Sequence, residues 1–214
     1  SDIACGSGQH LQAYGQRVGE NGLAVGFDFS PHAVDACRLK GLNVCVADAG
    51  NIPLPSASMD ILTCNYAIYY MPDLVRVLKE WARVLKPGGV LLISGPAADS
   101  NSELYLFHQA ITGCAPSDVD RMALGYVETQ LPPSLVGSGF EAAQLRTWSN
   151  VVTFPDRNAF LSYWMSTSLF LSTVPHENRE EAYATACQML SPGSGMVVTK
   201  RVTVLTTRRT GASE

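Results

Sequence analysis

The feature that most constrains the fold of this chain is a turn of small residues at its start. Residues 2–8 read Asp-Ile-Ala-Cys-Gly-Ser-Gly, and a helical segment follows from Gln9. A strand that ends in two glycines lets a ligand approach the backbone closely, and the amides that open the next helix favour an anionic group. In a doubly wound sheet this turn lies in the crevice where ligands bind. Taken alone, a Gly-x-Gly turn is equally compatible with a purely structural role.

Strand and helix signals alternate along residues 1–95, with short turns between them. This alternation predicts an α/β fold of the doubly wound kind, with a parallel sheet covered by helices on both faces. The helix at 31–40 has marked ends, because Ser30 is a suitable N-cap, Pro31 takes the first helical position and Gly41 follows the last. Residues 87–89, Pro-Gly-Gly, predict a turn. The predicted strands lie at 2–4, 24–28, 43–47, 59–65 and 90–95, and the other predicted helices at 9–18 and 73–85.

The pattern changes after Pro96, although the 214 residues suit a single domain with a modest insertion. We expect helices at 101–114, 155–171 and 177–190, and strands at 141–152 and 197–207. The segment 154–190 is therefore predicted to be a helical insertion before the last strand. Its aromatic and Met residues suit an apolar lid over a small-molecule site, and they also suit ordinary packing of an inserted helix pair.

An acidic residue follows the second predicted strand at a telling distance from the glycines. Asp28 lies 20 residues after Gly8, where a carboxylate can accept hydrogen bonds from both hydroxyls of a ribose. A helix cap or a surface acid is the alternative, but Ser30 already supplies the cap. A dinucleotide fingerprint would also need a small residue three positions after the second glycine, and Leu11 stands there. A nucleoside ligand without a pyrophosphate is favoured.

With these residues in view, the sequence resembles class I S-adenosylmethionine-dependent methyltransferases, especially the small-molecule group that includes the quinone-biosynthesis C-methyltransferases. The resemblance is carried by 2–8 (Asp-Ile-Ala-Cys-Gly-Ser-Gly), 26–30 (Gly-Phe-Asp-Phe-Ser), 48–49 (Asp-Ala) before 52–55 (Ile-Pro-Leu-Pro), 59–62 (Met-Asp-Ile-Leu), 65–71, and 85–89 (Leu-Lys-Pro-Gly-Gly). Their order over some ninety residues makes the combination specific. It implies a seven-stranded, mostly parallel sheet with an antiparallel last strand, and S-adenosyl-L-methionine as cofactor. It also implies that strand and helices preceding Ser1 are missing.

The resemblance assigns cofactor roles to residues that follow the first four strands. The small residues of the first turn would line the methionine and sugar parts of the ligand, Asp28 would hold the ribose hydroxyls, and Phe29 would flank the adenine. Asp48 would accept from the exocyclic amine of the adenine, and the Ala49 amide would donate to the ring. The Asn65 carbonyl would accept from the amino group of the ligand. The cofactor-binding set is Ala4, Cys5, Gly6, Gly8, Asp28, Phe29, Asp48, Ala49 and Asn65.

Candidates for a general base are few. If the acceptor is a hydroxyl or a carbon acid, a base must lie within about 3 Å of the proton that it removes. The predicted catalytic residues are Tyr70, which follows the fourth strand and by the resemblance would begin the substrate-facing wall, and His108, in the helix after the fifth strand. Both residues also have plain structural interpretations, a core tyrosine for Tyr70 and a buried or surface histidine for His108.

The net charge and the cysteine content limit which partners and metals are expected. A net charge of −4 and the absence of a basic stripe argue against nucleic acid as a partner. No apolar run is long enough to span a membrane. The six cysteines lack zinc or redox spacing, which favours no metal, no disulfides and a cytoplasmic location. We therefore expect methyl transfer to a small, apolar or aromatic molecule. One alternative is a catalytically silent methyltransferase-like binding or scaffold domain. Another is a nicotinamide-dependent oxidoreductase, although Leu11 counts against it. A homodimer is left open.

Overall fold

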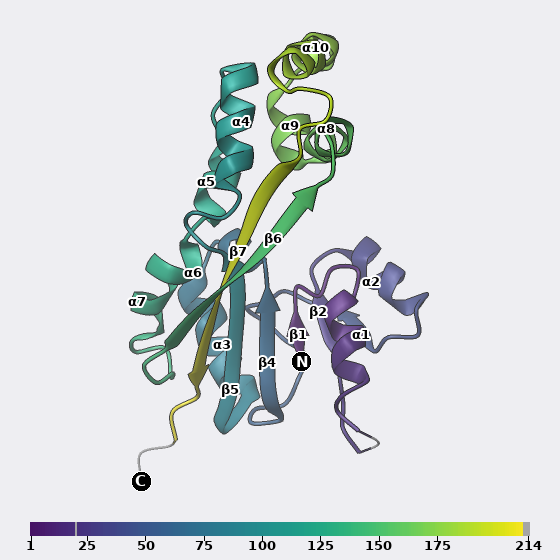
Figure 1. Ribbon diagram of the computed structural model, residues 1–214. Helices are drawn as coiled ribbons and strands as arrows, with labels where there is room; N and C mark the ends of the chain where they lie inside the picture. The colour runs from purple at the N-terminus through teal and green to yellow at the C-terminus, as the bar shows by residue number, and fades with distance from the viewer. Residues whose placement is uncertain (20, 212–214) are drawn as a thin grey trace. The chain divides into compact units, whose positions relative to one another are not determined.

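The strands of this protein form one sheet in a computed structural model that describes residues 1–19 and 21–211. The described residues form seven strands in the order β3-β2-β1-β4-β5-β7-β6 (Figure 1). The neighbouring pairs from β3 to β5 are parallel; Asp2 of β1, for example, lies opposite both Gly26 of β2 and Thr63 of β4. The strands are β1 (Asp2–Ile3), β2 (Gly26–Asp28), β3 (Val44–Val46), β4 (Met59–Asn65), β5 (Leu85–Pro96), β6 (Gln144–Phe154) and β7 (Met196–Arg208).

The last strand runs against the others. The Gly89 carbonyl accepts from the Arg209 amide, whereas the Ala97 amide donates to the Arg201 carbonyl. Residue numbers therefore rise along β5 while they fall along its partner, which is the antiparallel arrangement. The predicted sheet, doubly wound and mostly parallel with an antiparallel last strand, is confirmed.

Helices connect the strands, and two of them begin at side-chain caps, of which the first was predicted from the sequence. Ser30 accepts from the Ala33 amide at the start of α2, and Asp73 accepts from the Arg76 amide at the start of α3. The helices are α1 (Gln9–Gly15), α2 (Pro31–Arg38), η1 (Ile68–Tyr70), α3 (Leu74–Val84), α4 (Ser102–Thr112), α5 (Asp118–Ala123), α6 (Tyr126–Thr129), α7 (Leu131–Leu135), α8 (Arg157–Ser166), α9 (Ser168–Thr173), η2 (His176–Asn178) and α10 (Arg179–Met189).

These elements divide into two compact units. Among the described residues, the first comprises 1–19, 21–95, 126–146 and 203–211, and the second comprises 96–125 and 147–202. The sequence predicts one domain with a helical insertion at 154–190. The second unit contains residues 154–190 together with α4 and α5, and the single domain with an insertion stays a prediction.

The core of the first unit forms where α3 covers the sheet. Val77, Leu78, Trp81 and Val84 are all buried, and they recur at the three- and four-residue spacing that the sequence shows. Leu11 of α1 is buried as well, and a Cβ added to Gly26 of β2 would lie 2.6 Å from its Cδ2. Leu11 thus fills the space where a dinucleotide-binding turn would need a small residue.

The second unit has an aromatic core of its own. Phe160, Trp164 and Phe170 are completely or almost completely buried, and Phe107 packs edge-on against the first two with ring centroids 4.8 and 5.1 Å away. These rings fill the interior of their own unit, and the lid considered for the 154–190 segment stays a prediction.

Two predicted boundaries are wrong. The helix predicted at 155–171 is interrupted at Thr167, whose extended backbone ends α8 and whose hydroxyl caps α9. Residues 87–89 lie inside β5 instead of before it. Met59 of β4 pairs with Leu85 and Ile61 pairs with Val90, so the Pro-Gly-Gly run forms an irregularity in the ladder, with Gly88 at a φ of 75°.

Candidate cofactor site

The turn after β1 is left-handed at alternate residues. Ala4, Gly6 and Gly8 have φ values of 55°, 53° and 81°. A Cβ added to Gly6 would meet nothing within 4 Å, whereas one added to Gly8 would lie 2.5 Å from Cδ1 of Leu42 and 2.8 Å from Sγ of Cys37. Gly6 therefore leaves open space beside the backbone, and Gly8 permits close packing against the second helix.

Asp28 links this turn to the end of β2. Its Oδ2 accepts from the Gly6 amide at 2.8 Å, and its Oδ1 accepts from the Ser30 amide at 2.9 Å. Each carboxylate oxygen has a second lone-pair direction, so both can still accept from a ligand. The predicted ribose-binding acid is thus held in one orientation by the backbone of the glycine turn.

A cavity of about 460 Å³ lies at the carboxyl ends of the first strands of the sheet. This volume falls within the range of small-molecule sites, about 300–1,000 Å³, and the ends of neighbouring parallel strands are where doubly wound folds bind ligands. Six of the predicted site residues line it: Ala4, Asp28, Phe29, Asp48, Ala49 and Tyr70. Phe29 and Tyr70 are well exposed, so their rings are free to contact a ligand.

Asp48 is held by two groups at the edge of this cavity. Its Oδ1 accepts from the Gly50 amide at 2.9 Å, and its Oδ2 accepts from Nη2 of Arg76 at 2.7 Å. The Gly50 amide, followed by Arg76, holds the pKa of the Asp48 carboxyl below its usual value. Sequence reasoning missed Arg76, because a charged residue in an amphipathic helix is normally only part of the solvated face.

The two adjacent tyrosines of η1 lie in different surroundings. Tyr69 is buried, with its ring 6.3 Å from that of Tyr126, whereas Tyr70 is mostly exposed and lines the cavity. A single 3₁₀ turn aims neighbouring side chains in different directions, which sequence spacing alone does not resolve.

Asn65 ends β4 within a buried polar network. Its Nδ2 donates to Oδ1 of Asp2 and to the hydroxyl of Tyr14, both at 3.3 Å, and its Oδ1 accepts from the Ser94 hydroxyl at 2.8 Å. Burial raises the pKa of Asp2, and the hydrogen bond from Thr63 opposes that rise. The network fixes the side chain of Asn65, while the ligand contact assigned to its carbonyl stays a prediction. Cys5, Gly6, Gly8 and Asn65 do not line the cavity itself.

The surroundings of His108 do not suit the role of general base that was predicted for it. His108 is completely buried in the second unit, where Nδ1 accepts from Nε1 of Trp164 at 3.0 Å and Nε2 lies 2.9 Å from the Thr173 hydroxyl. Burial lowers its pKa, partly opposed by Asp120. A general base needs an accessible nitrogen that can receive a proton. Both nitrogens of this ring are occupied, so the assignment of His108 as a catalytic residue is withdrawn.

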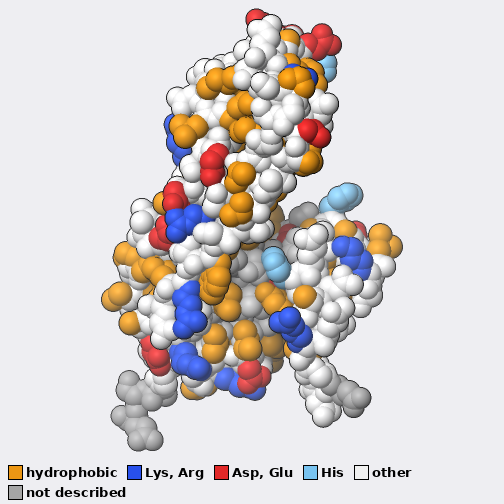
Figure 2. Space-filling model, viewed as in Figure 1, with side chains coloured by type: hydrophobic (Ala, Val, Ile, Leu, Met, Phe, Trp, Pro, Cys, Tyr) orange, Lys and Arg blue, Asp and Glu red, His pale blue; other side chains and the backbone are white. Residues whose placement is uncertain are grey.

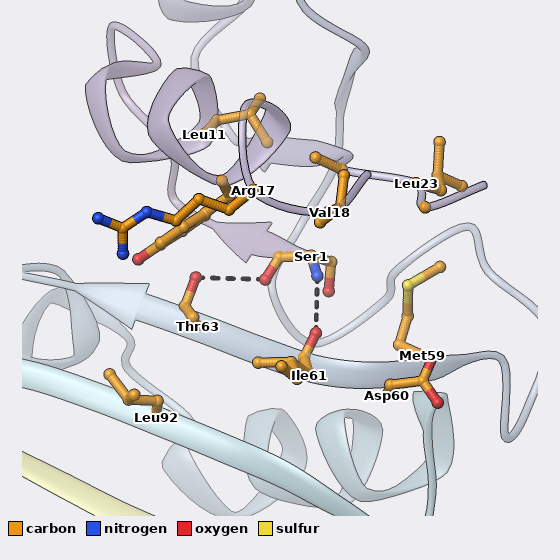
Figure 3. A pocket seen from close by; sticks show the side chains of 13 residues that line it. Ser1, Leu11, Arg17, Val18, Leu23, Met59, Asp60, Ile61, Thr63 and Leu92 are labelled. Carbon is orange, nitrogen blue, oxygen red and sulfur yellow. Dashed lines mark hydrogen bonds between the residues drawn. The ribbon is translucent and has the colours of Figure 1, made fainter. Parts of the chain in front are cut away.

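A second cavity, of about 560 Å³, lies on the sheet side of α1. Figure 3 shows its wall of mainly apolar side chains, among them Leu11, Val18, Ile61 and Leu92, with the Ser1 amine donating to the Ile61 carbonyl. None of the predicted site residues lines it. We assign no ligand to it.

Within the part of the chain that the structure describes, no cluster of three or more His, Cys, Asp or Glu side chains could hold a metal ion, and all six cysteines are free. On the face that Figure 2 shows, Lys and Arg side chains lie among acidic and apolar ones. No helix within the described ranges is both long and apolar enough to cross a membrane.

The strand order, the glycine turn after β1 and the acids after β2 and β3 define a Rossmann-like fold of the methyltransferase class. Residues 1–93 match the family model described as a methyltransferase domain. Over 98 residues the chain is 34% identical to demethylmenaquinone methyltransferase from Bacillus cereus, a match that covers 42% of this chain and 41% of the relative. The chain thus spans less than half the length of this curated relative. The resemblance to quinone-biosynthesis methyltransferases is confirmed.

Solved structures agree on the fold. The YcgJ protein of Bacillus subtilis superposes with a TM-score of 0.62 at 17% identity, covering 99% of this chain and 91% of that one. A SAM-dependent methyltransferase from Aquifex aeolicus does so with a TM-score of 0.55 at 17% identity, covering 96% and 79%. These structures support the fold, and the match to the methyltransferase family model supports S-adenosylmethionine as the cofactor.

Proposed function

We propose that this protein transfers a methyl group from S-adenosylmethionine to a small, apolar or aromatic acceptor. The observation that carries the proposal is the 460 Å³ cavity at the carboxyl ends of the strands, where Asp28 and Asp48 lie with two exposed aromatic rings. Bound S-adenosylmethionine would supply an electrophilic methyl group: the acceptor would attack the methyl carbon in line, and the carbon–sulfur bond would break with S-adenosylhomocysteine as the leaving group. The relatives named demethylmenaquinone methyltransferases support an acceptor of a similar chemical class.

The residues present fit an adenosine ligand. Two carboxylates with free lone pairs suit the hydroxyls of a ribose and the amine of an adenine. The open space beside Gly6 leaves room for a ligand against the backbone, and Phe29 offers an apolar face for a base. Because a sulfonium is already a good leaving group, holding the two reactants in register would supply much of the rate.

Tyr70 is the predicted catalytic residue that this proposal keeps. Its exposed ring lines the cavity wall, which supports a contact with the bound ligand or the acceptor. The proposal needs no other side chain as a base when the acceptor is itself a strong nucleophile. The homodimer and the cytoplasmic location stay predictions.

The test is ligand binding by Asp28 variants, with S-adenosylhomocysteine titrated calorimetrically. Asp28→Ala should weaken binding by roughly 1–3 kcal/mol, because two ribose hydroxyls lose a charged acceptor. Asp28→Asn should lose less, since it keeps one acceptor oxygen in a similar position. Asp35→Ala is the matched control: Asp35 is an acid on α2, exposed and paired with Arg38.

An unchanged dissociation constant in both Asp28 variants would remove the assigned site. Methyl transfer from labelled S-adenosylmethionine to a panel of apolar and aromatic metabolites then separates an enzyme from a silent binding domain. Binding without transfer to any member of the panel would favour the silent domain.

A further inference from the structure

Helix α3 holds the loop that follows β3. Glu80 accepts from the Ile52 amide through Oε1 at 2.7 Å, and Arg83 donates to the Ile52 carbonyl through Nη2 at 3.1 Å. The Trp81 indole donates to the Ala49 carbonyl at 3.0 Å. These bonds fix the backbone of the loop from three points of one helix, so the loop has little freedom to rearrange around a ligand.

Arg76 lies one turn before Glu80 on the same helix. Unlike the three contacts above, which reach the backbone of the loop, its contact reaches the Asp48 side chain. Its Nη2 donates to Oδ2 of Asp48 at 2.7 Å, and its Nη1 lies 3.4 Å from the Gly50 carbonyl. Because the Gly50 amide donates to Oδ1 of Asp48 at 2.9 Å, each carboxylate oxygen has one fixed donor. The plane of the carboxylate, and with it the direction of the remaining lone pairs, is therefore set.

The Arg76 guanidinium occupies the space that a side chain at residue 50 would enter. A Cβ added to Gly50 would lie 2.6 Å from Cζ of Arg76 and 2.9 Å from its Nε. The φ of Gly50 is not in the left-handed region, so the backbone alone does not require glycine. A side chain at residue 50 would therefore have to displace the Arg76 head group.

We propose that Arg76 is a positioning residue that makes the loop after β3 selective for a 6-aminopurine. The inference rests on the proposed contact between Asp48 and the adenine amine. An ionised carboxylate with fixed lone pairs can accept from an amine at position 6, whereas a 6-oxo group would bring a second acceptor against it. A site built to hydrogen-bond one group discriminates strongly against an analogue that lacks it. Without Arg76, the Asp48 side chain can rotate and this discrimination is lost.

The experiment compares S-adenosylhomocysteine with S-inosylhomocysteine, in which an oxo group replaces the amine. Dissociation constants for both are measured calorimetrically with the wild-type protein, Arg76→Ala, Asp48→Ala and the double variant. We expect Arg76→Ala to lower the preference for the adenosyl ligand by about tenfold, as the loss of an oriented charge-assisted hydrogen bond implies. In the Asp48→Ala background, Arg76→Ala should change the preference less than twofold.

Two further variants serve as a control and as an independent test of the role of Arg76. Lys79→Ala removes an exposed cation from the same helix and should leave the preference unchanged. Gly50→Ala should displace the guanidinium and lower the preference while Arg76 itself is intact, which also serves if Arg76→Ala fails to fold.

The outcomes are distinguishable. If the wild-type protein binds neither ligand, the proposed function fails first. If it binds S-adenosylhomocysteine but Arg76→Ala and Gly50→Ala keep its preference, the inference about Arg76 is overturned and the cofactor site stands. An equal loss of both ligands in Arg76→Ala also overturns the inference, because it indicates a general structural role.

Discussion

At the scale of single residues, the two glycines of the turn after β1 serve different purposes. Both have positive φ, so an alanine at either position strains the backbone. Only Gly8 is also crowded, by the side chains of Leu42 and Cys37. Gly6 faces open space, and its amide is the group that orients Asp28.

Substitution separates the two roles. Gly8→Ala should lower the free energy of unfolding by roughly 2–4 kcal/mol, through backbone strain and overpacking. Gly6→Ala should lower it by only about 1–2 kcal/mol, yet should weaken binding of S-adenosylhomocysteine because a methyl group enters the open space. Urea unfolding and calorimetric titration of both variants check this. Equal effects of the two variants on stability would show that the packing at Gly8 carries little free energy.

At the scale of elements, a threonine decides where one helix ends and the next begins. Thr167 donates to the Trp164 carbonyl at 2.6 Å and accepts from the Phe170 amide at 3.3 Å, so its hydroxyl both closes α8 and opens α9. The apolar spacing of 155–171 continues across this point, which is why the sequence pattern predicts one uninterrupted helix.

Thr167→Ala should therefore lower the free energy of unfolding by about 0.5–2 kcal/mol, the usual range for loss of an N-cap. Thr185→Ala on α10 is the control, because that hydroxyl donates to the Glu181 carbonyl within its own helix and caps nothing. The control should change stability by about 0.5 kcal/mol or less. Thr167→Ala being more stable than the wild type would mean that a continuous helix is preferred there.

At the scale of the whole molecule, the stability of the fold is linked to pH by a buried histidine in the second unit. Burial lowers the pKa of His108, so the folded protein keeps its ring neutral. In the unfolded chain a histidine has a pKa of about 6.5. As the pH falls below that value, the unfolded state binds a proton that the folded state excludes, and stability falls.

His108→Gln tests this linkage. The wild type should be the more stable protein near pH 7, and its advantage should shrink towards pH 5 by at most about 1.4 kcal/mol per pH unit, the limit for one proton. Urea unfolding at half-unit steps of pH measures it. The remaining histidines, His10, His32 and His176, are common to both proteins, so the difference isolates His108. A stability difference that is independent of pH would contradict a neutral, buried ring.

Features that depend on neighbouring residues could be predicted without the structure. The strand and helix alternation, the cap at Ser30, the glycine turn and the acid at Asp28 follow from local chemistry, and parallel strands bring such strand ends to one edge. The other predicted cavity residues came from the resemblance to a known family, whose motifs occur here in the same order.

Contacts between side chains that lie far apart in the sequence could not be predicted and became visible in the folded chain. Arg76 reaches Asp48 over 28 residues, and His108 bonds to partners 56 and 65 residues away. A pattern of spacing gives the face on which a residue lies, but not the group that packs against that face. The same histidine can therefore be read as a base in sequence and yet be a buried structural link once the chain has folded.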